Sequence, residues 1–216
     1  YAQLKTGEIS KIKGVDLVLG ASEKFNLDSF IEKRNKEKIS KTYSCSIDSF
    51  KDFNSSFSDT NSSRTRSFLK IQDGCDYKCT YCTIPLARGQ SRSDSIENVV
   101  KNVKKIVLKG FKEIVLTGIN LGDYGNLNGK LNNKNSGLIS LLNKLENISG
   151  EVRYRISSIE PNLLSDEIIE FVSHSKKFLP HFHIPLQSGS DQVLRDMKRR
   201  YNSRFYSNLI FNIKKV

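Results

Sequence analysis

The chain has no tryptophan, only four prolines and a single methionine, Met197. It also lacks any run close to the roughly 20 consecutive apolar residues that a membrane-spanning helix needs. Residues 1–5 do not show the charged-then-apolar layout of a secretory signal. These absences predict a cytoplasmic protein without a membrane partner. Because the sequence begins with Tyr1 and its one methionine lies near the other end, we expect it to be a fragment of a longer protein.

Cysteine is scarce as well. The chain has four, of which Cys75, Cys79 and Cys82 fall close together in sequence while Cys45 stands alone. A disulfide framework is not expected in a chain without an export signal, because cytosolic thiols are kept reduced. The close clustering therefore indicates metal ligation or redox chemistry.

Acidic residues are outnumbered. The 35 Lys and Arg against 23 Asp and Glu leave a formal net charge of +12. Such a charge favours a polyanionic partner, because each phosphate contact releases condensed counterions, and nucleic acid is the leading candidate. A lysine-rich surface that only keeps the protein soluble would give the same balance. Charge alone leaves both interpretations open.

The apolar pattern after residue 64 alternates between strands and helices. We expect strands at 67–71, 113–117, 152–158 and 181–185, and helices at 94–110, 138–148, 165–172 and 203–215, with Asp94 capping the first of these. Four such units in a row predict an α/β fold with a parallel sheet, either doubly wound or part of a β/α barrel. In both arrangements ligands bind at the carboxyl ends of the strands.

Composition divides the chain into three segments. Residues 1–38 contain a strand at 15–19 and a charged helical stretch up to Lys38, which predicts a small α/β unit. Residues 39–63 are rich in Ser, Asp, Asn and Thr and are expected to form a linker, because they can bury little apolar surface. Residues 64–216 then form the main domain.

The three clustered cysteines have the spacing C-x3-C-x2-C within one loop. A four-iron cluster usually takes four cysteines, so three ligands leave one iron open for chemistry. Structural zinc is the alternative, but it favours two separated pairs of ligands, and the three histidines lie far away at 174, 181 and 183. Cys45 could supply a fourth ligand, although a free thiol in the linker is the simpler interpretation.

This loop resembles the signature of radical S-adenosylmethionine enzymes. Five further segments resemble the methylthiotransferase family in the same order, namely 64–75, 84–93, 157–161, 183–190 and 197–201, and residues 115–125 resemble the branch that acts on threonylcarbamoyladenosine in tRNA. The resemblance implies a partial radical S-adenosylmethionine (β/α) barrel. It also identifies residues 1–38 as the remnant of an amino-terminal domain whose second [4Fe-4S] cluster uses cysteines that this chain does not contain.

The resemblance further implies a catalytic role for the clustered cysteines. Cys75, Cys79 and Cys82 would bind a [4Fe-4S] cluster, and its open iron would bind S-adenosylmethionine, whose reductive cleavage gives a 5′-deoxyadenosyl radical. The implied reaction adds a methylthio group to C2 of N6-threonylcarbamoyladenosine at position 37 of tRNA. Alternative substrates are isopentenyladenosine in tRNA and a ribosomal protein. The alternative to an enzyme is a non-catalytic metal-binding module for nucleic acid. The implied partners are the anticodon region of tRNA and a flavodoxin or ferredoxin, and the expected state is a monomer.

The same resemblance suggests which residues bind S-adenosylmethionine. Tyr81 would lie beside the adenine, and Gly118 and Asn120 at the methionine end. Arg155, Ser157 and Glu160 lie at the end of the third expected strand and would bind the ribose or carboxylate, and Gln187 would be a further polar group of the pocket. Packing is the alternative for Tyr81, and a surface Arg–Glu pair is the alternative for Arg155 and Glu160. The basic run Lys198–Arg200 and a lysine stripe from Lys101 to Lys112 could contact RNA, or the stripe could be a solvated helix face.

Overall fold

The computed structural model describes residues 1–32, 40–47, 53–58, 65–127, 130–131 and 137–216. Parts of three expected segments lie outside these residues: the helical stretch up to Lys38, the linker at 39–63, and the far end of the loop that follows the second strand. In the described part of the chain, no helix is both long and apolar enough to cross a membrane.

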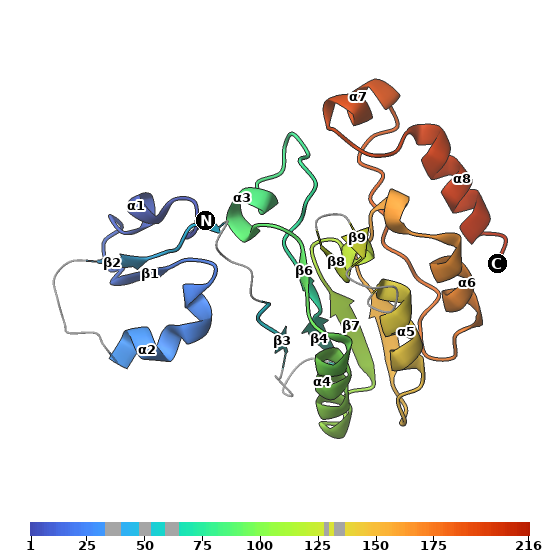
Figure 1. The fold of residues 1–216 in the computed structure, drawn as a ribbon, viewed down its shortest axis with the longest axis horizontal. Coiled ribbons are helices and arrows are strands. Elements are labelled where there is room, and N and C mark those ends of the chain that lie inside the picture. The colour runs from blue at the N-terminus through green and yellow to red at the C-terminus, as the bar shows by residue number, and fades with distance from the viewer. Residues whose placement is uncertain (33–39, 48–52, 59–64, 128–129, 132–136) are drawn as a thin grey trace.

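The amino-terminal unit is a small α/β arrangement that lies to one side of the molecule (Figure 1). Its elements are α1 (Thr6–Ile9), β1 (Leu17–Leu19), the 3₁₀ turn η1 (Glu23–Asn26), α2 (Leu27–Glu32) and β2 (Lys41–Tyr43). Strands β1 and β2 are parallel, with Leu17 opposite Lys41. Strand β2 falls within the segment expected to be a linker, because local composition cannot reveal a pairing partner more than twenty residues away.

A four-stranded sheet with the order β10-β7-β4-β3 forms the centre of the main domain. Its strands are β3 (Ser56–Phe57), β4 (Arg66–Lys70), β7 (Glu113–Thr117) and β10 (Arg153–Ile156). The last three are mutually parallel, and the short edge strand β3 is antiparallel to β4. Because consecutive parallel strands are neighbours, this sheet has the order of a β/α barrel wall, although no closed barrel forms among the described residues.

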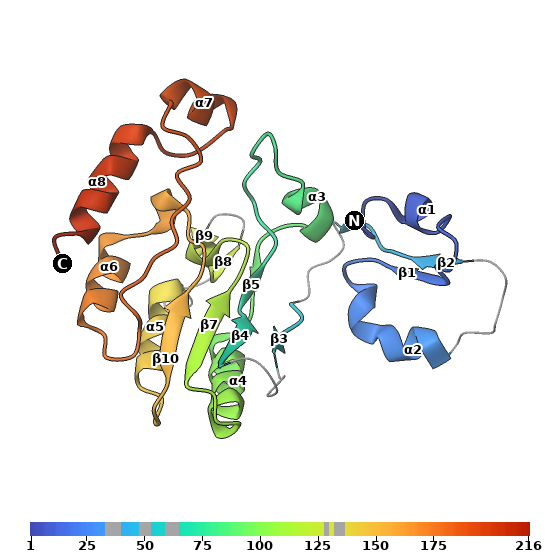
Figure 2. The same cartoon turned by 180° about the vertical axis from the view of Figure 1, so that it is seen from behind.

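The helices α4 (Ile96–Leu108) and α5 (Leu138–Glu146) cover one face of this sheet, in front of it in Figure 1 and behind it in Figure 2. Alternate strand residues point into that layer, and Leu69, Leu116 and Ile156 are at most 2% exposed. Val103 of α4 and Leu141 of α5 are fully buried against them. The core therefore lies between sheet and helices, as the strand and helix periodicities predict.

Helix α4 begins one residue later than its sequence suggests. Ser95 is the N-cap, and its hydroxyl accepts a hydrogen bond from the backbone N–H of Asn98 (3.2 Å). The carboxylate of Asp94, the expected cap, instead accepts from the Ser95 N–H (3.0 Å) and from the Asn98 side chain (2.8 Å). Both residues support the first turn, but only Ser95 has the capping geometry.

The expected fourth strand at 181–185 does not form. This segment makes a single isolated bridge, from His183 to Ser158, and Phe178 just before it bridges to Tyr154 of β10. Pro180 and Pro185 flank it, and proline cannot donate a backbone hydrogen bond to a strand ladder. The expected third strand likewise ends at Ile156 rather than at residue 158.

The remaining elements surround this framework. They are the strand pair β5 (Gln72–Asp73) and β6 (Arg92–Ser93), α3 (Ile84–Arg88), the 3₁₀ turns η3 (Leu121–Asp123) and η4 (Pro161–Leu163), the strand pair β8 (Asn126–Leu127) and β9 (Lys130–Leu131), and the helices α6 (Asp166–His174), α7 (Asp191–Asp196) and α8 (Ser203–Ile213). Helices α6 and α8 match two expected helices closely.

Candidate functional site

The three clustered cysteines lie in the loop of residues 74–83, here called the cysteine loop, which follows β5 and leads into α3. Its first residue, Gly74, has φ +73°. The backbone N–H of Cys75 donates to the Gly89 carbonyl (3.1 Å), and the Ser91 N–H donates to the Asp76 carboxylate (3.0 Å). The loop is therefore fixed against the strand pair β5–β6 at the carboxyl end of β4.

The thiols of this loop are available as ligands. None of the three forms a disulfide, and all are partly buried. Burial is the main cause that raises the pKa of Cys75 to about 11, and the nearby Asp123, Cys79 and Cys82 act in the same direction, so the three sulfur atoms share one environment. Within the described residues, no three His, Cys, Asp or Glu side chains are arranged to hold a single metal ion. A [4Fe-4S] cluster needs a different arrangement, since each thiolate binds its own iron.

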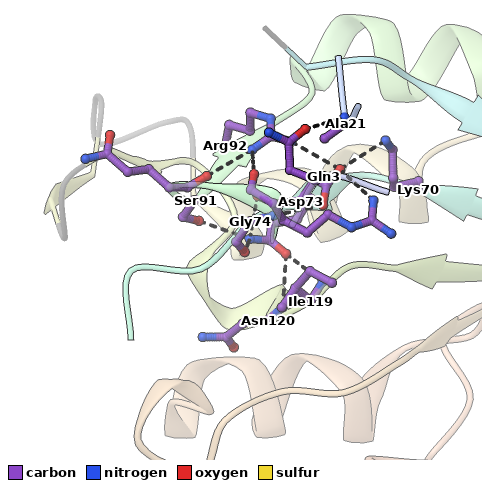
Figure 3. A network of polar contacts seen from close by, with 12 residues as sticks. Gln3, Ala21, Lys70, Asp73, Gly74, Ser91, Arg92, Ile119 and Asn120 are labelled. Carbon is purple, nitrogen blue, oxygen red and sulfur yellow. Dashed lines mark hydrogen bonds and ion pairs between the residues drawn. The ribbon is translucent and has the colours of Figure 1, made fainter. Parts of the chain in front are cut away.

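Gln72 connects the cysteine loop to the loop after β7. The side chain is 1% exposed, and its Oε1 accepts hydrogen bonds from the N–H groups of Ile119 (2.8 Å) and Asn120 (3.0 Å). Its Nε2 donates to the Gly74 carbonyl (2.9 Å) and to the Ser91 hydroxyl (3.0 Å). Figure 3 shows Ile119 and Asn120 beside Gly74 in this network. One buried amide thus joins the carboxyl ends of two neighbouring strands.

Asp73 holds the start of the cysteine loop from the other side (Figure 3). Its side chain is 5% exposed, and it accepts a hydrogen bond from the Gly74 N–H (2.9 Å). Three cations surround it, Lys70 at 3.4 Å, Arg88 at 3.5 Å and Arg92 at 3.3 Å. These ion pairs and the hydrogen bond to Gly74 fix the direction in which the loop leaves β5.

Asn120 has a side chain whose hydrogen-bonding capacity is only partly used. The residue is 2% exposed, and its Oδ1 accepts from the Glu160 N–H (3.4 Å). Its Nδ2 is buried without a hydrogen-bond partner. An unpaired buried donor is costly, and this one fits a bound acceptor such as the carboxylate of an amino acid.

A buried arginine links Glu160 to the cysteine loop. The guanidinium of Arg199 forms an ion pair with the Glu160 carboxylate, and its side chain is 3% exposed. The same guanidinium donates to the hydroxyl of Tyr81 (3.1 Å) and to Sγ of Cys79 (3.3 Å). Tyr81 itself is half exposed, so its ring remains accessible to a ligand.

The structure distributes the expected ligand residues unevenly. Tyr81, Asn120 and Glu160 contact one another or the cysteine loop through the hydrogen bonds above, and an added Cβ on Gly118 would lie 2.8 Å from Oε1 of Gln72. Of the other three, Arg155 donates to Glu113 (3.0 Å), Ser157 donates its N–H to the Leu116 carbonyl near the end of β7 (3.2 Å), and Gln187 is exposed with φ +66°.

Cys45 lies with the amino-terminal unit. Its sulfur is 3.0 Å from the Ser22 hydroxyl, and its N–H donates to the Glu23 carboxylate (3.0 Å). Gln3 completes this contact by donating to the Cys45 carbonyl (2.9 Å) and accepting from the Ala21 N–H (2.8 Å). The recorded contacts of Cys45 therefore hold β2 to the unit formed by residues 1–32.

Sequence reasoning missed Gln72 and misjudged Arg199. Gln72 immediately precedes the Asp73-Gly74-Cys75 sequence, but one buried glutamine leaves no periodic signal. Arg199 stands in a basic run that suggests contact with RNA, whereas its side chain is used inside the protein. Burial is what distinguishes Arg199 from its two basic neighbours. Burial depends on the folded chain, so the linear sequence gives no signal of it.

Comparison with known families identifies the superfamily of the chain. The radical SAM superfamily matches residues 69–216. The chain therefore belongs to the radical SAM superfamily, and the predicted membership of this superfamily is confirmed.

The chain is also similar to curated proteins. It is 38% identical over 217 residues to the threonylcarbamoyladenosine tRNA methylthiotransferase MtaB of Bacillus subtilis (strain 168), with 100% of this chain and 47% of that protein covered. The protein of the same name from Thermotoga maritima is 37% identical, with 100% and 48% covered. The tRNA-2-methylthio-N(6)-dimethylallyladenosine synthase of Clostridium botulinum (strain Hall) is 36% identical over 151 residues, with 70% and 33% covered. The chain spans about half the length of the relatives that match it throughout.

A solved structure supports the fold. The cobalamin-dependent S-adenosylmethionine radical enzyme OxsB, with aqua-cobalamin and S-adenosylmethionine bound, matches with a TM-score of 0.56 at 18% identity, covering 68% of this chain and 22% of that one. This likeness concerns the fold, and it agrees with the predicted parallel α/β arrangement.

Proposed function

We propose that this chain is part of a radical S-adenosylmethionine methylthiotransferase that modifies C2 of N6-threonylcarbamoyladenosine at position 37 of tRNA. The observation that carries the proposal is the cysteine loop, whose three free thiols lie at the carboxyl end of a parallel strand near Asn120, whose side-chain Nδ2 has no hydrogen-bond partner. Two relatives with the matching name align with the whole chain, which supports the choice of substrate.

The residues present fit an iron–sulfur cluster with one open iron. Cys75, Cys79 and Cys82 would hold it, whereas the contacts of Cys45 are with Ser22 and Glu23 of the amino-terminal unit. When bound, the cluster and S-adenosylmethionine supply a one-electron reductive cleavage that makes hydrogen abstraction possible. Every other contribution comes from side chains that orient the two groups.

Three side chains are suited to orient S-adenosylmethionine. The buried Nδ2 of Asn120 can donate to its carboxylate, which would satisfy an otherwise unpaired group. The half-exposed ring of Tyr81 can stack on the adenine. Glu160, fixed by Arg199 and by the Asn120 side chain, can accept from the ribose hydroxyls. A role in orienting S-adenosylmethionine is also proposed for Arg155, Ser157 and Gln187, on the basis of their places in the sequence.

The wider organisation follows from the same proposal. Residues 1–38 would belong to an amino-terminal domain that carries a second [4Fe-4S] cluster in the whole protein, 39–63 to a linker and 64–216 to the catalytic domain. The substrate would present its anticodon region to a monomer, and a flavodoxin or ferredoxin would supply the electron. A tRNA substrate and such carriers imply a cytoplasmic location.

The relative from Clostridium botulinum favours one alternative substrate, because its name refers to dimethylallyladenosine rather than threonylcarbamoyladenosine. Its alignment covers a smaller share of the chain, so we place this substrate second. The two substrates differ in the group on N6, and they are expected to share the cysteine loop.

The first experiment measures iron, sulfide and zinc after anaerobic reconstitution, beside the triple variant Cys75→Ala, Cys79→Ala, Cys82→Ala. We expect about four irons per chain, absent from the triple variant, and an electron paramagnetic resonance signal of the reduced sample that changes when S-adenosylmethionine is added. Stoichiometric zinc without any response to the cofactor would show instead a structural metal module.

A second experiment addresses the substrate. The reconstituted chain is mixed with tRNA that carries threonylcarbamoyladenosine, isopentenyladenosine or no modification at position 37, and binding is measured at constant salt. Tightest binding to the first tRNA supports the proposal. A preference for the second would move the chain to the alternative branch, and equal binding of all three would remove support for either.

A further inference from the structure

The carboxyl-terminal turn of α7 is fastened to the cysteine loop, from which it is separated by more than a hundred residues. The Thr80 hydroxyl donates to the Asp196 carbonyl (3.1 Å), and the Thr80 N–H donates to the Met197 carbonyl (3.4 Å). Both contacts lie between Cys79 and Cys82. The end of α7 therefore sets the position of the second half of the loop.

The same turn fixes the position of Arg199. After α7 ends, Lys198 adopts φ +59°, and the Arg199 N–H donates back to the Leu194 carbonyl (2.9 Å). This is the hydrogen bond of a Schellman motif, in which a left-handed residue closes the helix. Such a position usually holds glycine, and a lysine there is strained. The strain indicates that the fold requires Arg199, the residue that follows, to leave the helix in this direction.

The side chain of Arg199 connects the end of α7 with two other parts of the site. Its guanidinium reaches the carboxylate of Glu160 after β10 and the sulfur of Cys79 in the cysteine loop. Its Nε is buried without a hydrogen-bond partner. A side chain that is 3% exposed and directed inward is not available to RNA, unlike the exposed Lys198 and Arg200 on either side of it.

We propose that Arg199 is a positioning residue that holds Cys79 as a cluster ligand and raises the reduction potential of the cluster. This inference rests on the proposed function, since it requires the cluster. Reduction adds one negative charge to the iron–sulfur unit, and a cationic donor on a ligand sulfur stabilises the reduced form more than the oxidised form. Glu160 keeps the guanidinium in the orientation that this hydrogen bond needs.

The test compares the reconstituted wild-type chain with Arg199→Lys and Arg199→Met. Arg195→Met is the matched control, because it removes the same charge from an exposed position of α7 whose guanidinium donates to Gln192 (2.7 Å). Iron content, the rate of iron loss to a chelator and the midpoint potential are measured for each, the last by electron paramagnetic resonance in a redox titration without S-adenosylmethionine.

We expect Arg199→Met to lower the ratio of reduced to oxidised cluster about tenfold at the wild-type midpoint, which corresponds to about 59 mV for a one-electron couple. The midpoint potential of Arg199→Lys should lie between those of the wild type and Arg199→Met, because an ammonium lacks the fork that reaches Glu160 and Cys79 together. Both variants should lose iron faster, and Arg195→Met should match the wild type.

Two results separate this inference from the proposed function. If the wild-type chain takes up no iron, the proposed function is wrong and the inference falls with it. If all chains take up iron and Arg199→Lys and Arg199→Met have the wild-type potential and rate of iron loss, only the inference is wrong. Should Arg199→Met fail to fold, the lysine variant decides, because it keeps the charge and most of the packing volume.

Discussion

At Gly74 the cysteine loop requires a residue without a side chain. The residue has φ +73°, and a Cβ there would lie 2.0 Å from the Gln90 carbonyl oxygen and 2.8 Å from that of Gly89. Both obstacles are backbone atoms, which cannot rotate away. The glycine thus allows the loop to approach the segment before β6, and this approach brings Cys75 into hydrogen-bond distance of Gly89.

We expect Gly74→Ala to lower the free energy of unfolding by more than about 3 kcal/mol, because a clash with backbone adds to an unfavourable φ. Urea denaturation of the iron-free chain measures the loss. Gly189→Ala is the control, since nothing lies within 4 Å of its Cβ position and its φ is not positive. Equal stability of both variants would show that the segment around Gln90 moves easily.

The thiol of Cys75 is expected to react slowly in the iron-free chain. Burial raises its pKa to about 11, whereas an unperturbed cysteine has a pKa of about 8.5. At pH 8.5 its alkylation by iodoacetamide should therefore be roughly a hundredfold slower than in the urea-unfolded chain, and the rate should rise until about pH 11. Mass spectrometry of the peptide that contains Cys75 gives the rate, and a midpoint near 8.5 would contradict the burial.

The raised pKa of Cys75 also determines how the stability of the iron-free chain changes with pH. A thiol whose pKa is raised by folding favours the folded chain while both states are protonated, below about pH 8.5. Its contribution is lost as the pH rises through the folded value near 11. Replacing Cys75 with alanine should therefore reduce the loss of stability of the iron-free chain in this alkaline range.

Individual residues were predictable where chemistry follows from spacing alone. The three cysteines follow from their spacing, and Asn120 was named from its resemblance to a family motif. Gln72 and the inward role of Arg199 could not be predicted, because each depends on contacts between segments far apart in the chain. Arg155 shows the converse, since its position at a strand end suggested a ligand, but its guanidinium is paired with Glu113.

Among the elements, helix α4 allows a direct test of which residue caps it. Ser95→Ala removes the hydroxyl that accepts from the Asn98 N–H, and we expect a loss of about 1 kcal/mol in the free energy of unfolding. Ser140→Ala is the control, because it lies inside α5, where alanine is favoured. If Ser95→Ala is as stable as the wild type, Asp94 caps the helix after all.

Elements with strong periodicity were predicted well, and short ones were not. The apolar stripe of α4 and the uninterrupted apolar strand β7 are signals within one segment. Strands β2 and β3 form only because β1 and β4 offer them an edge, so their own Ser- and Asn-rich surroundings gave no indication. The extended segment at 181–185 has the composition of a strand, but flanking prolines limit its pairing to a single bridge.

At the scale of the whole molecule, the sites of interest gather at one end of the sheet. The cysteine loop, the loop after β7 and the end of β10 all follow carboxyl ends of parallel strands, and α3 and α7 both lie towards that end of the sheet (Figures 1 and 2). Helix α4 lies towards the opposite end. The net charge of +12 is a property of the sequence, whereas the part of it that faces a substrate depends on this arrangement.

This arrangement predicts which basic residues bind tRNA. Each phosphate contact contributes roughly −0.7 to −0.9 to the slope of log affinity against log salt, so Lys198→Gln with Arg200→Gln should reduce that slope by about 1.5. Lys101→Gln, Lys104→Gln and Lys105→Gln together remove more charge, but their side chains lie on the exposed part of α4 away from the cysteine loop, so they should leave the slope unchanged. The slopes of the two variants are compared by measuring tRNA binding between low and physiological salt. A larger effect of the three lysines would mean that RNA approaches the helical layer, and that net charge rather than the carboxyl edge of the sheet determines binding.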